Sequence, residues 1–138
     1  MPPKLAELLE MLSLVRDRQE RIDLLISLAE RFQPATLEGP LPEESRVPGC
    51  ESEVFVFAKP LRAGLKFDFV VQNPQGVSAK ALAVILDETL SGEDLKGVAE
   101  VPESVVYDIF GRELSMGKSM GLMNTVRMVK ALALRAAG

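Results

Sequence analysis

The chain has 138 residues and a mass of 15.1 kDa, the size of one domain with room for a buried core. Its 20 acidic and 16 basic side chains give a net charge of −4, which argues against a nucleic-acid partner. The absence of histidine excludes any imidazole base or ligand. The single cysteine excludes an internal disulfide, which favours a reducing, cytoplasmic setting. No apolar run approaches the roughly 20 residues that span a bilayer, so no membrane partner is expected.

Two amphipathic helices are predicted at the start of the chain. Leucines recur with helical spacing over residues 5–12 and predict a first, short helix. Asp17, followed three residues later by Glu20, resembles a capping box that opens a second helix, which should end before Pro34. The buried face expected for this helix is Ile22, Leu25, Ile26 and Ala29, and the side chains expected in water are Arg18, Arg21 and Glu30.

A hairpin is predicted in the middle of the chain. Residues 33–49 are rich in proline and glycine and form a long irregular loop, which delivers Cys50. Residues 54–59 are rich in valine and phenylalanine, and residues 65–72 alternate apolar and polar side chains, so both segments are predicted strands. We expect them to pair as an antiparallel sheet of two or three strands.

The rest of the chain is predicted to be helical. Ser78 is expected to cap a third, largely buried helix, and residues 91–94 to restart a short helical turn. Pro102 suits the first position of a further helix that Gly111 stops, and a long last helix follows. The order ααββααα, with the strands grouped centrally, predicts an α+β fold in a single domain over residues 1–138.

Cys50 is the one strong nucleophile that the sequence offers. A lone cysteine is often an inert, buried hydrophobe, but this one follows Pro48 and Gly49 on a loop. Arg46 would favour its thiolate, whereas the nearby acidic residues would oppose it. Without a neighbouring general base, the thiol suits attack on an already activated sulfur better than attack on an amide or ester. These features favour a sulfur acceptor.

Two motifs resemble those of the SufE sulfur-acceptor proteins. The family run glycine-cysteine-glutamine-serine-x-valine-tryptophan stands here as Gly49-Cys50-Glu51-Ser52-Glu53-Val54-Phe55. Its second motif, histidine-leucine-serine-proline-serine-arginine-serine-x-glycine-leucine, has its counterpart in residues 113–122, where Lys118 takes the place of the arginine. The likeness also covers the chain length, the two leading helices, the proline-rich approach to the cysteine and the central hairpin.

The resemblance implies a fold similar to the cluster scaffold protein IscU and a role in sulfur relay. SufE proteins accept sulfur from the persulfide of a SufS-type cysteine desulfurase, stimulate that enzyme, and pass the sulfur to a SufBCD-like scaffold that assembles iron–sulfur clusters. Cys50 would be the acceptor. The chain would then act as a carrier and activator rather than as an enzyme in its own right, and it would need no cofactor.

The remaining candidate site residues are Arg46, Gly49, Glu51, Ser52 and Lys118, which would contact the partner or shape the surroundings of the thiol. Lys118 is either a solvated charge at the start of a helix or a cation near the sulfur anion. Lysine keeps the charge of the family's arginine but loses its planar fork. Gly117 and Gly121 are expected to let the backbone turn into the last helix.

Other kinds of site are excluded. Gly117, Lys118 and Ser119 resemble the end of a phosphate-binding loop, but Arg112 stands where that motif needs glycine. One cysteine without histidine cannot build the usual zinc or iron–sulfur coordination, so no metal is expected.

Two alternatives to the sulfur relay stay open. One is a binding module that regulates a desulfurase or a scaffold without covalent chemistry, with Cys50 as a passenger. The other is a thiol peroxidase or redox sensor.

Overall fold

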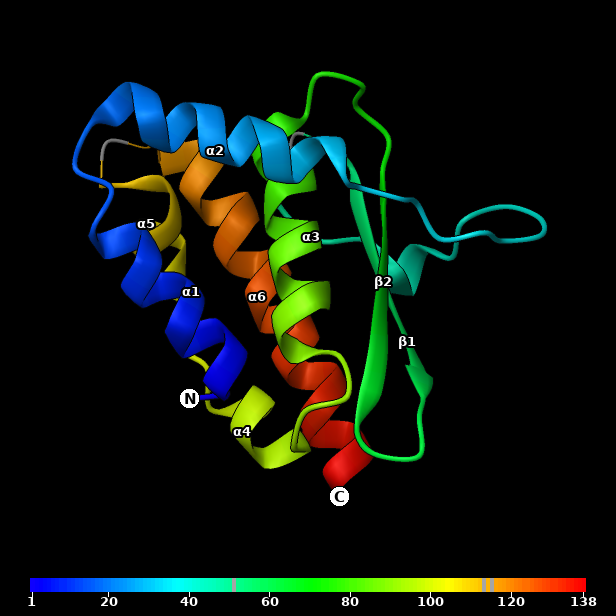
Figure 1. The fold of residues 1–138 in the computed structure, drawn as a ribbon. Helices are drawn as coiled ribbons and strands as arrows, with labels where there is room; N and C mark the ends of the chain where they lie inside the picture. Colours follow the sequence, from blue (N-terminus) through cyan, green and yellow to red (C-terminus); the bar gives the residue numbers. More distant parts are fainter. Residues whose placement is uncertain (51, 113, 115) are drawn as a thin grey trace.

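The computed structural model describes residues 1–50, 52–112, 114 and 116–138, without the side chains of residues 116 and 117. In chain order its elements are α1 (Pro3–Ser13), α2 (Arg18–Glu30), the 3-10 turn η1 (Glu43–Ser45), β1 (Val54–Pro60), β2 (Leu65–Val71), α3 (Val77–Leu90), α4 (Leu95–Ala99), α5 (Val105–Phe110) and α6 (Met116–Ala137). Figure 1 shows the β1–β2 hairpin along one side of the molecule and the helices beside it. The predicted α+β fold is confirmed.

The sheet seen in the described residues is one antiparallel pair, in which Val54 lies opposite Val71. Strand β2 contacts α3, and β1 contacts α6. The buried side chains are Val54, Phe55 and Val56 in β1 and Leu65, Phe67 and Phe69 in β2. The alternation in β2 therefore points one face at the helices, as its sequence predicts.

Helix α3 lies in the centre of the fold (Figure 1) and contacts α1, α2, α6 and β2. Its buried side chains are Ala79, Ala81, Leu82, Ala83, Val84, Ile85, Leu86, Thr89 and Leu90. The prediction of a buried third helix is confirmed. The predicted cap at Ser78 is wrong, because the N-cap residue is Gly76 and no side chain caps the helix. Residue 78 already lies in the first turn.

The second helix begins as predicted but faces the core differently. The carboxylate of Asp17 accepts a hydrogen bond of 3.1 Å from the backbone N–H of Glu20. The prediction that Ile22 and Ile26 are buried is wrong, because they are 39% and 43% exposed. The buried residues are Leu25, Leu28 and Ala29, which are spaced by three and four positions and form a narrower apolar stripe. The contacts of α2 with α3 thus decided which side of an ambiguous helix turned inward.

The prediction that Arg21 stays in water is also wrong. Its Nη1 donates hydrogen bonds to the carbonyls of Asp108 (2.8 Å) and Ile109 (3.0 Å), near the end of α5. Its Nη2 donates to the carbonyls of Leu12 (2.5 Å) and Val15 (3.2 Å), at and beyond the end of α1. Carbonyls at helix C-termini lack partners within their own helix, and a guanidinium supplies several donors at once. These five residues, called the Arg21 corner below, join α1, α2 and α5.

In the described part of the chain, three helices follow α3, whereas the predicted order ααββααα has only two after the third helix. The expected short turn extends into α4, whose N-cap Asp94 accepts a hydrogen bond of 3.1 Å from the backbone N–H of Gly97. The predicted start of the next helix at Pro102 is wrong, because α5 begins at Val105 after Ser104. Its predicted stop at Gly111 is confirmed, with a φ of 88° that favours glycine. None of the helices described is both long enough and apolar enough to cross a membrane.

Candidate functional site

The loop that carries Cys50 is fastened to the sheet on both sides of the cysteine. Before it, the Val47 N–H donates to the Val54 carbonyl at 2.8 Å, and Arg46 forms an isolated bridge with Phe55. After it, the Ser52 carbonyl accepts a hydrogen bond of 3.2 Å from the backbone N–H of Asn73. Residues 46–50 together with 52 and 53 are called the Cys50 loop below. The sheet therefore sets where this loop leaves β1.

Two residues of the loop have left-handed backbone conformations. Gly49 has a φ of 67°, which glycine adopts at little cost. Glu53 has a φ of 51°, and among the described residues it is the one non-glycine residue with a positive φ. Its N–H donates to the Cys50 carbonyl at 3.2 Å, which ties the start of β1 to the cysteine. The backbone thus turns sharply just before the cysteine and again before β1 begins.

Helix α6 lies directly against this loop. A Cβ atom added to Gly121 would lie 3.0 Å from Cα of Cys50 and 3.2 Å from the Gly49 carbonyl oxygen, so a side chain there would press on the backbone of the loop. One turn further along, the side-chain amide of Asn124 donates a hydrogen bond of 2.9 Å to the Pro48 carbonyl. The expected role of Gly121 in turning the backbone into the helix is wrong, because this residue lies inside α6 and makes room for the loop.

Cys50 is a free, half-buried thiol that packs against the hydrophobic core at the edge of a cleft of about 250 Å³. The cleft is lined by Cys50, Ser52, Asn73, Gln75, Gly76, Val77, Ser78, Ala79, Lys118, Gly121 and Leu122. Lys118 is the one charged side chain among these described residues. Segments from the cysteine loop, the turn after β2, the start of α3 and the start of α6 therefore meet around the thiol.

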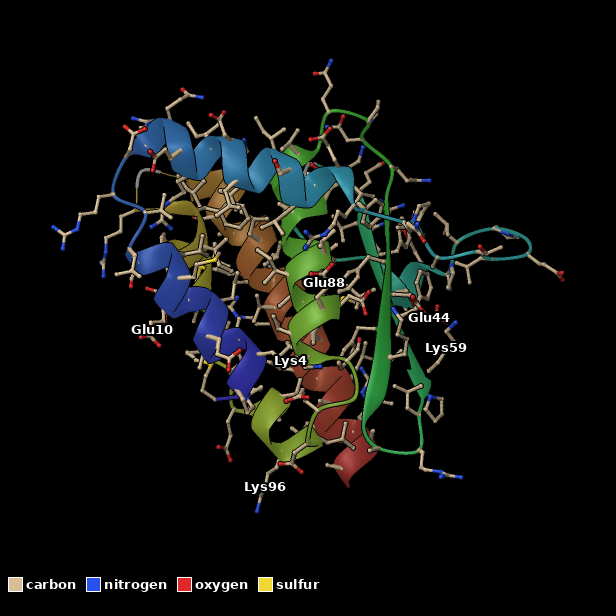
Figure 2. All side chains as sticks on the ribbon, in the orientation of Figure 1. Lys4, Glu10, Glu44, Lys59, Glu88 and Lys96 are labelled. Atoms are coloured by element: carbon tan, nitrogen blue, oxygen red, sulfur yellow. The ribbon has the colours of Figure 1, made fainter. Side chains whose placement is uncertain are left out.

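The structure brings together some of the predicted site residues and not others. Ser52 and Lys118 line the same cleft as Cys50, and Gly49 directly precedes it. Glu51 lies outside the described residues. Arg46 does not line the cleft: its guanidinium pairs with Glu43 (2.8 Å) and Glu53 (3.5 Å). Figure 2 draws the side chains on the ribbon and labels Glu44 of η1 and Lys59 of β1, which lie on the hairpin side of the molecule.

Besides its two ion pairs, Arg46 contacts an aromatic ring of β1. Its Cζ lies 4.8 Å from the ring centroid of Phe55, a cation–π contact. The hydrogen bond to Glu43 is the main reason that the pKa of Arg46 is raised above its ordinary value. These contacts fasten the base of the Cys50 loop, so the structure supports a positioning role for Arg46 more directly than an effect on the thiolate.

Sequence reasoning missed several residues that shape the site. Asn73, Gln75 and Gly76 follow β2 and reach the cleft only because the hairpin returns to the start of β1. A Cβ atom on Gly76 would lie 2.9 Å from the Ser52 hydroxyl oxygen and 3.2 Å from the Asn73 carbonyl oxygen, so a side chain there would require its neighbours to shift. Nothing in the sequence marked Asn124 as part of the site, since an asparagine within a predicted helix has no expected partner. Gly121 gave one, because glycine inside a helix costs stability and calls for a reason.

Fold and site together define a small α+β protein with one loop-borne thiol at a polar cleft. The family model SufE, described as an Fe-S metabolism associated domain, matches residues 6–133. The chain therefore belongs to the SufE family, and its domain is associated with iron–sulfur metabolism.

A solved structure supports the fold independently. The solution structure of a hypothetical protein from Thermus thermophilus is similar to this chain with a TM-score of 0.76 and 26% sequence identity. The likeness covers 99% of this chain and 98% of that one, so it extends over all the elements described above. No match to this chain was found among curated proteins.

Proposed function

We propose that this chain is a sulfur-relay protein that accepts persulfide sulfur on Cys50 from a SufS-type cysteine desulfurase. In this role it stimulates the desulfurase and passes the sulfur on to a scaffold complex, similar to SufBCD, that assembles iron–sulfur clusters. Residues 1–138 would act as one domain. The observation that carries the proposal is the placement of Cys50, the chain's single thiol, at the edge of a cleft that Ser52 and Lys118 also line.

The proposed transfer needs no group that the chain lacks. The Cys50 thiolate attacks the terminal sulfur of the desulfurase persulfide, a new S–S bond forms on Cys50, and the desulfurase cysteine leaves as a thiolate. The sulfur atom moves without change in its oxidation state, so no oxidant or reductant takes part. The thiol proton passes to solvent before the attack, and the desulfurase thiolate departs without an acid because a thiolate is a good leaving group; it can take up a proton from solvent afterwards.

The cleft offers the acceptor sulfur both shelter and a cation. A persulfide on Cys50 adds one sulfur atom, which a cleft of about 250 Å³ can hold. Lys118 places a positive charge in the cleft, where it can stabilise the persulfide anion after transfer. The hydroxyl and amide side chains of Ser52, Asn73 and Gln75 can donate hydrogen bonds to a sulfur anion there.

Mass spectrometry of the intact protein tests the proposal. After incubation with a SufS-type desulfurase and cysteine, without reductant, we expect a mass gain of one or more sulfur atoms that a reductant removes. The variant Cys50→Ser should show no gain. An unchanged mass in the wild-type protein, with an active desulfurase and a free Cys50 thiol, would contradict the proposal.

The same variant separates the relay from a regulatory module. A passive regulator would stimulate the desulfurase equally well as Cys50→Ser, whereas a relay loses the stimulation that depends on removing sulfur from the enzyme. Desulfurase turnover, measured as alanine released from cysteine, gives this readout.

A further inference from the structure

One hydrogen bond joins helix α6 to the backbone just before the reactive cysteine. The Nδ2 atom of Asn124 donates to the carbonyl oxygen of Pro48 at 2.9 Å, across 76 positions of sequence. Pro48 lies two residues before Cys50, and a Cβ atom on the intervening Gly49 would be 3.5 Å from the same Nδ2 atom. The asparagine side chain therefore lies against the last turn of backbone before the thiol.

A second set of contacts fixes the orientation of that amide. The Oδ1 atom of Asn124 accepts a hydrogen bond of 2.8 Å from Nη1 of Arg127. The Nε atom of Arg127 in turn donates to Glu103 at 3.3 Å, and Lys130 pairs with the other carboxylate oxygen of Glu103 at 3.3 Å. If the amide flipped, its NH₂ group would face the Arg127 donor and its oxygen would face the Pro48 carbonyl oxygen. The amide nitrogen is thus held toward the loop.

Asn124 shares its helix face with Gly121. The two residues are three positions apart in α6, so they lie one above the other on the same side of the helix. Gly121 lets the backbone of Cys50 approach closely, and Asn124 fastens the approaching segment. Without the hydrogen bond from Asn124, the contact at Gly121 would hold the loop against α6 by packing alone.

We propose that Asn124 is a positioning residue for Cys50, which holds the thiol at the cleft and limits how often it moves out to meet bulky reagents or partners. The left-handed residues Gly49 and Glu53 on either side of Cys50 are the positions where the loop can pivot. The role in relay rests on the proposed function, but the control of Cys50 accessibility does not require any sulfur transfer.

The rate of reaction of Cys50 with 5,5′-dithiobis(2-nitrobenzoate) in native buffer tests the proposal, because this bulky disulfide reagent needs an accessible thiol. Asn124→Ala and Asn124→Leu should both react about three- to tenfold faster than the wild-type protein, the population change expected when one net hydrogen bond is lost. The leucine variant keeps most of the side-chain volume, so a faster rate there reports the lost bond rather than a cavity.

Two further variants serve as a graded test and a control. Arg127→Lys keeps the charge but cannot hold Glu103 and Asn124 with one planar group, so it should raise the rate by a smaller factor. Arg135→Gln changes an exposed residue near the other end of the same helix, so its rate should equal that of the wild-type protein. A wild-type rate in both Asn124 variants, or a slower one, would overturn the proposal.

A denaturant series distinguishes local release of the loop from general destabilisation. If Asn124 acts on the loop, the faster rates should not change over low urea concentrations at which the protein stays folded, because local opening exposes little new surface. Rates that rise with urea along the slope of global unfolding would show a merely structural role and would overturn the proposal. Since none of these measurements uses a desulfurase, their outcome is independent of the test of sulfur acceptance.

Discussion

In both the Cys50 loop and the Arg21 corner, one polar side chain from a helix donates hydrogen bonds to backbone carbonyls, but the number and the charge of these bonds differ. Arg21 is charged and reaches four backbone carbonyls at the ends of two helices. Asn124 is neutral and reaches one, at Pro48. Hydrogen bonds to charged donors contribute more than neutral ones, and several bonds must break together before the corner can open. We therefore expect the corner to open less often than the single contact between Asn124 and Pro48.

The largest effect that this comparison predicts is on stability at the corner. Arg21→Ala removes four hydrogen bonds from a charged donor to backbone carbonyls, so the free energy of unfolding should fall by about 3 kcal/mol. Urea denaturation measures this change. The matched control is Arg16→Ala, since Arg16 is exposed in the same region and should contribute almost nothing. Equal stabilities for the two variants would contradict the claim that the hydrogen bonds of Arg21 stabilise the corner.

The next largest effect should come from the close approach at Gly121. A methyl group there would press on the backbone of Cys50 and Gly49, so Gly121→Ala should lower the free energy of unfolding by about 1 kcal/mol despite its better helix propensity. Gly97→Ala in α4 is the control, because a Cβ atom added there would lie 3.8 Å from the Asp94 carboxylate, an ordinary contact, and the change should stabilise the protein. Thermal or urea unfolding of both variants tests the pair, and stabilisation by Gly121→Ala would refute the contact.

A smaller effect is expected for the charge beside the cleft. Lys118→Gln removes the one cation among the described lining residues, so acceptance of sulfur by Cys50 should slow about three- to tenfold. Lys118→Arg should retain most of the rate. Arg16→Gln removes the same charge near the corner and should leave the rate unchanged. A time course of the intact mass during a single turnover measures all three, and equal rates would mean that Lys118 is only a solvated charge.

The smallest effect concerns how stability depends on pH through Glu103, which is linked to Asn124 by Arg127. The pKa of Glu103 is lowered, first by a hydrogen bond from its own backbone N–H and then by Lys130 and Arg127. A lowered folded-state pKa means that the contribution is present above the ordinary value of 4.5 and is lost as the pH falls through the lowered pKa. Glu103 and its two basic partners are partly exposed, so we expect this contribution to the free energy of unfolding to be a few tenths of a kcal/mol. Glu103→Gln should remove this part of the acid dependence, and an identical pH profile in urea unfolding would contradict it.

Much of the local structure followed from residue patterns. The Asp17 cap, the stop at Gly111 and the alternating strand β2 were predicted correctly, because each depends on contacts between residues near in sequence. The inward face of α2 was not, since Ile22 and Leu25 are equally apolar and only packing against α3 chose between them. The same limit applies to Arg21, whose acceptors on α5 lie 87 and 88 positions away.

At the candidate site, too, the sequence determines some features and the tertiary structure decides the others. The sequence alone determined that Cys50 is the one thiol, that it stands on a proline- and glycine-rich loop before a strand, and that two motifs resemble the SufE family, because identity and order of residues suffice for these. Only the tertiary structure decided that Lys118 and Ser52 share its cleft, that Arg46 pairs with Glu43 and Glu53, and that Gly121 and Asn124 hold the loop. The contacts of Gly121 and Asn124 arise where α6 crosses the loop, and a contact such as that between Asn124 and Pro48, 76 positions apart, depends on how the whole core packs.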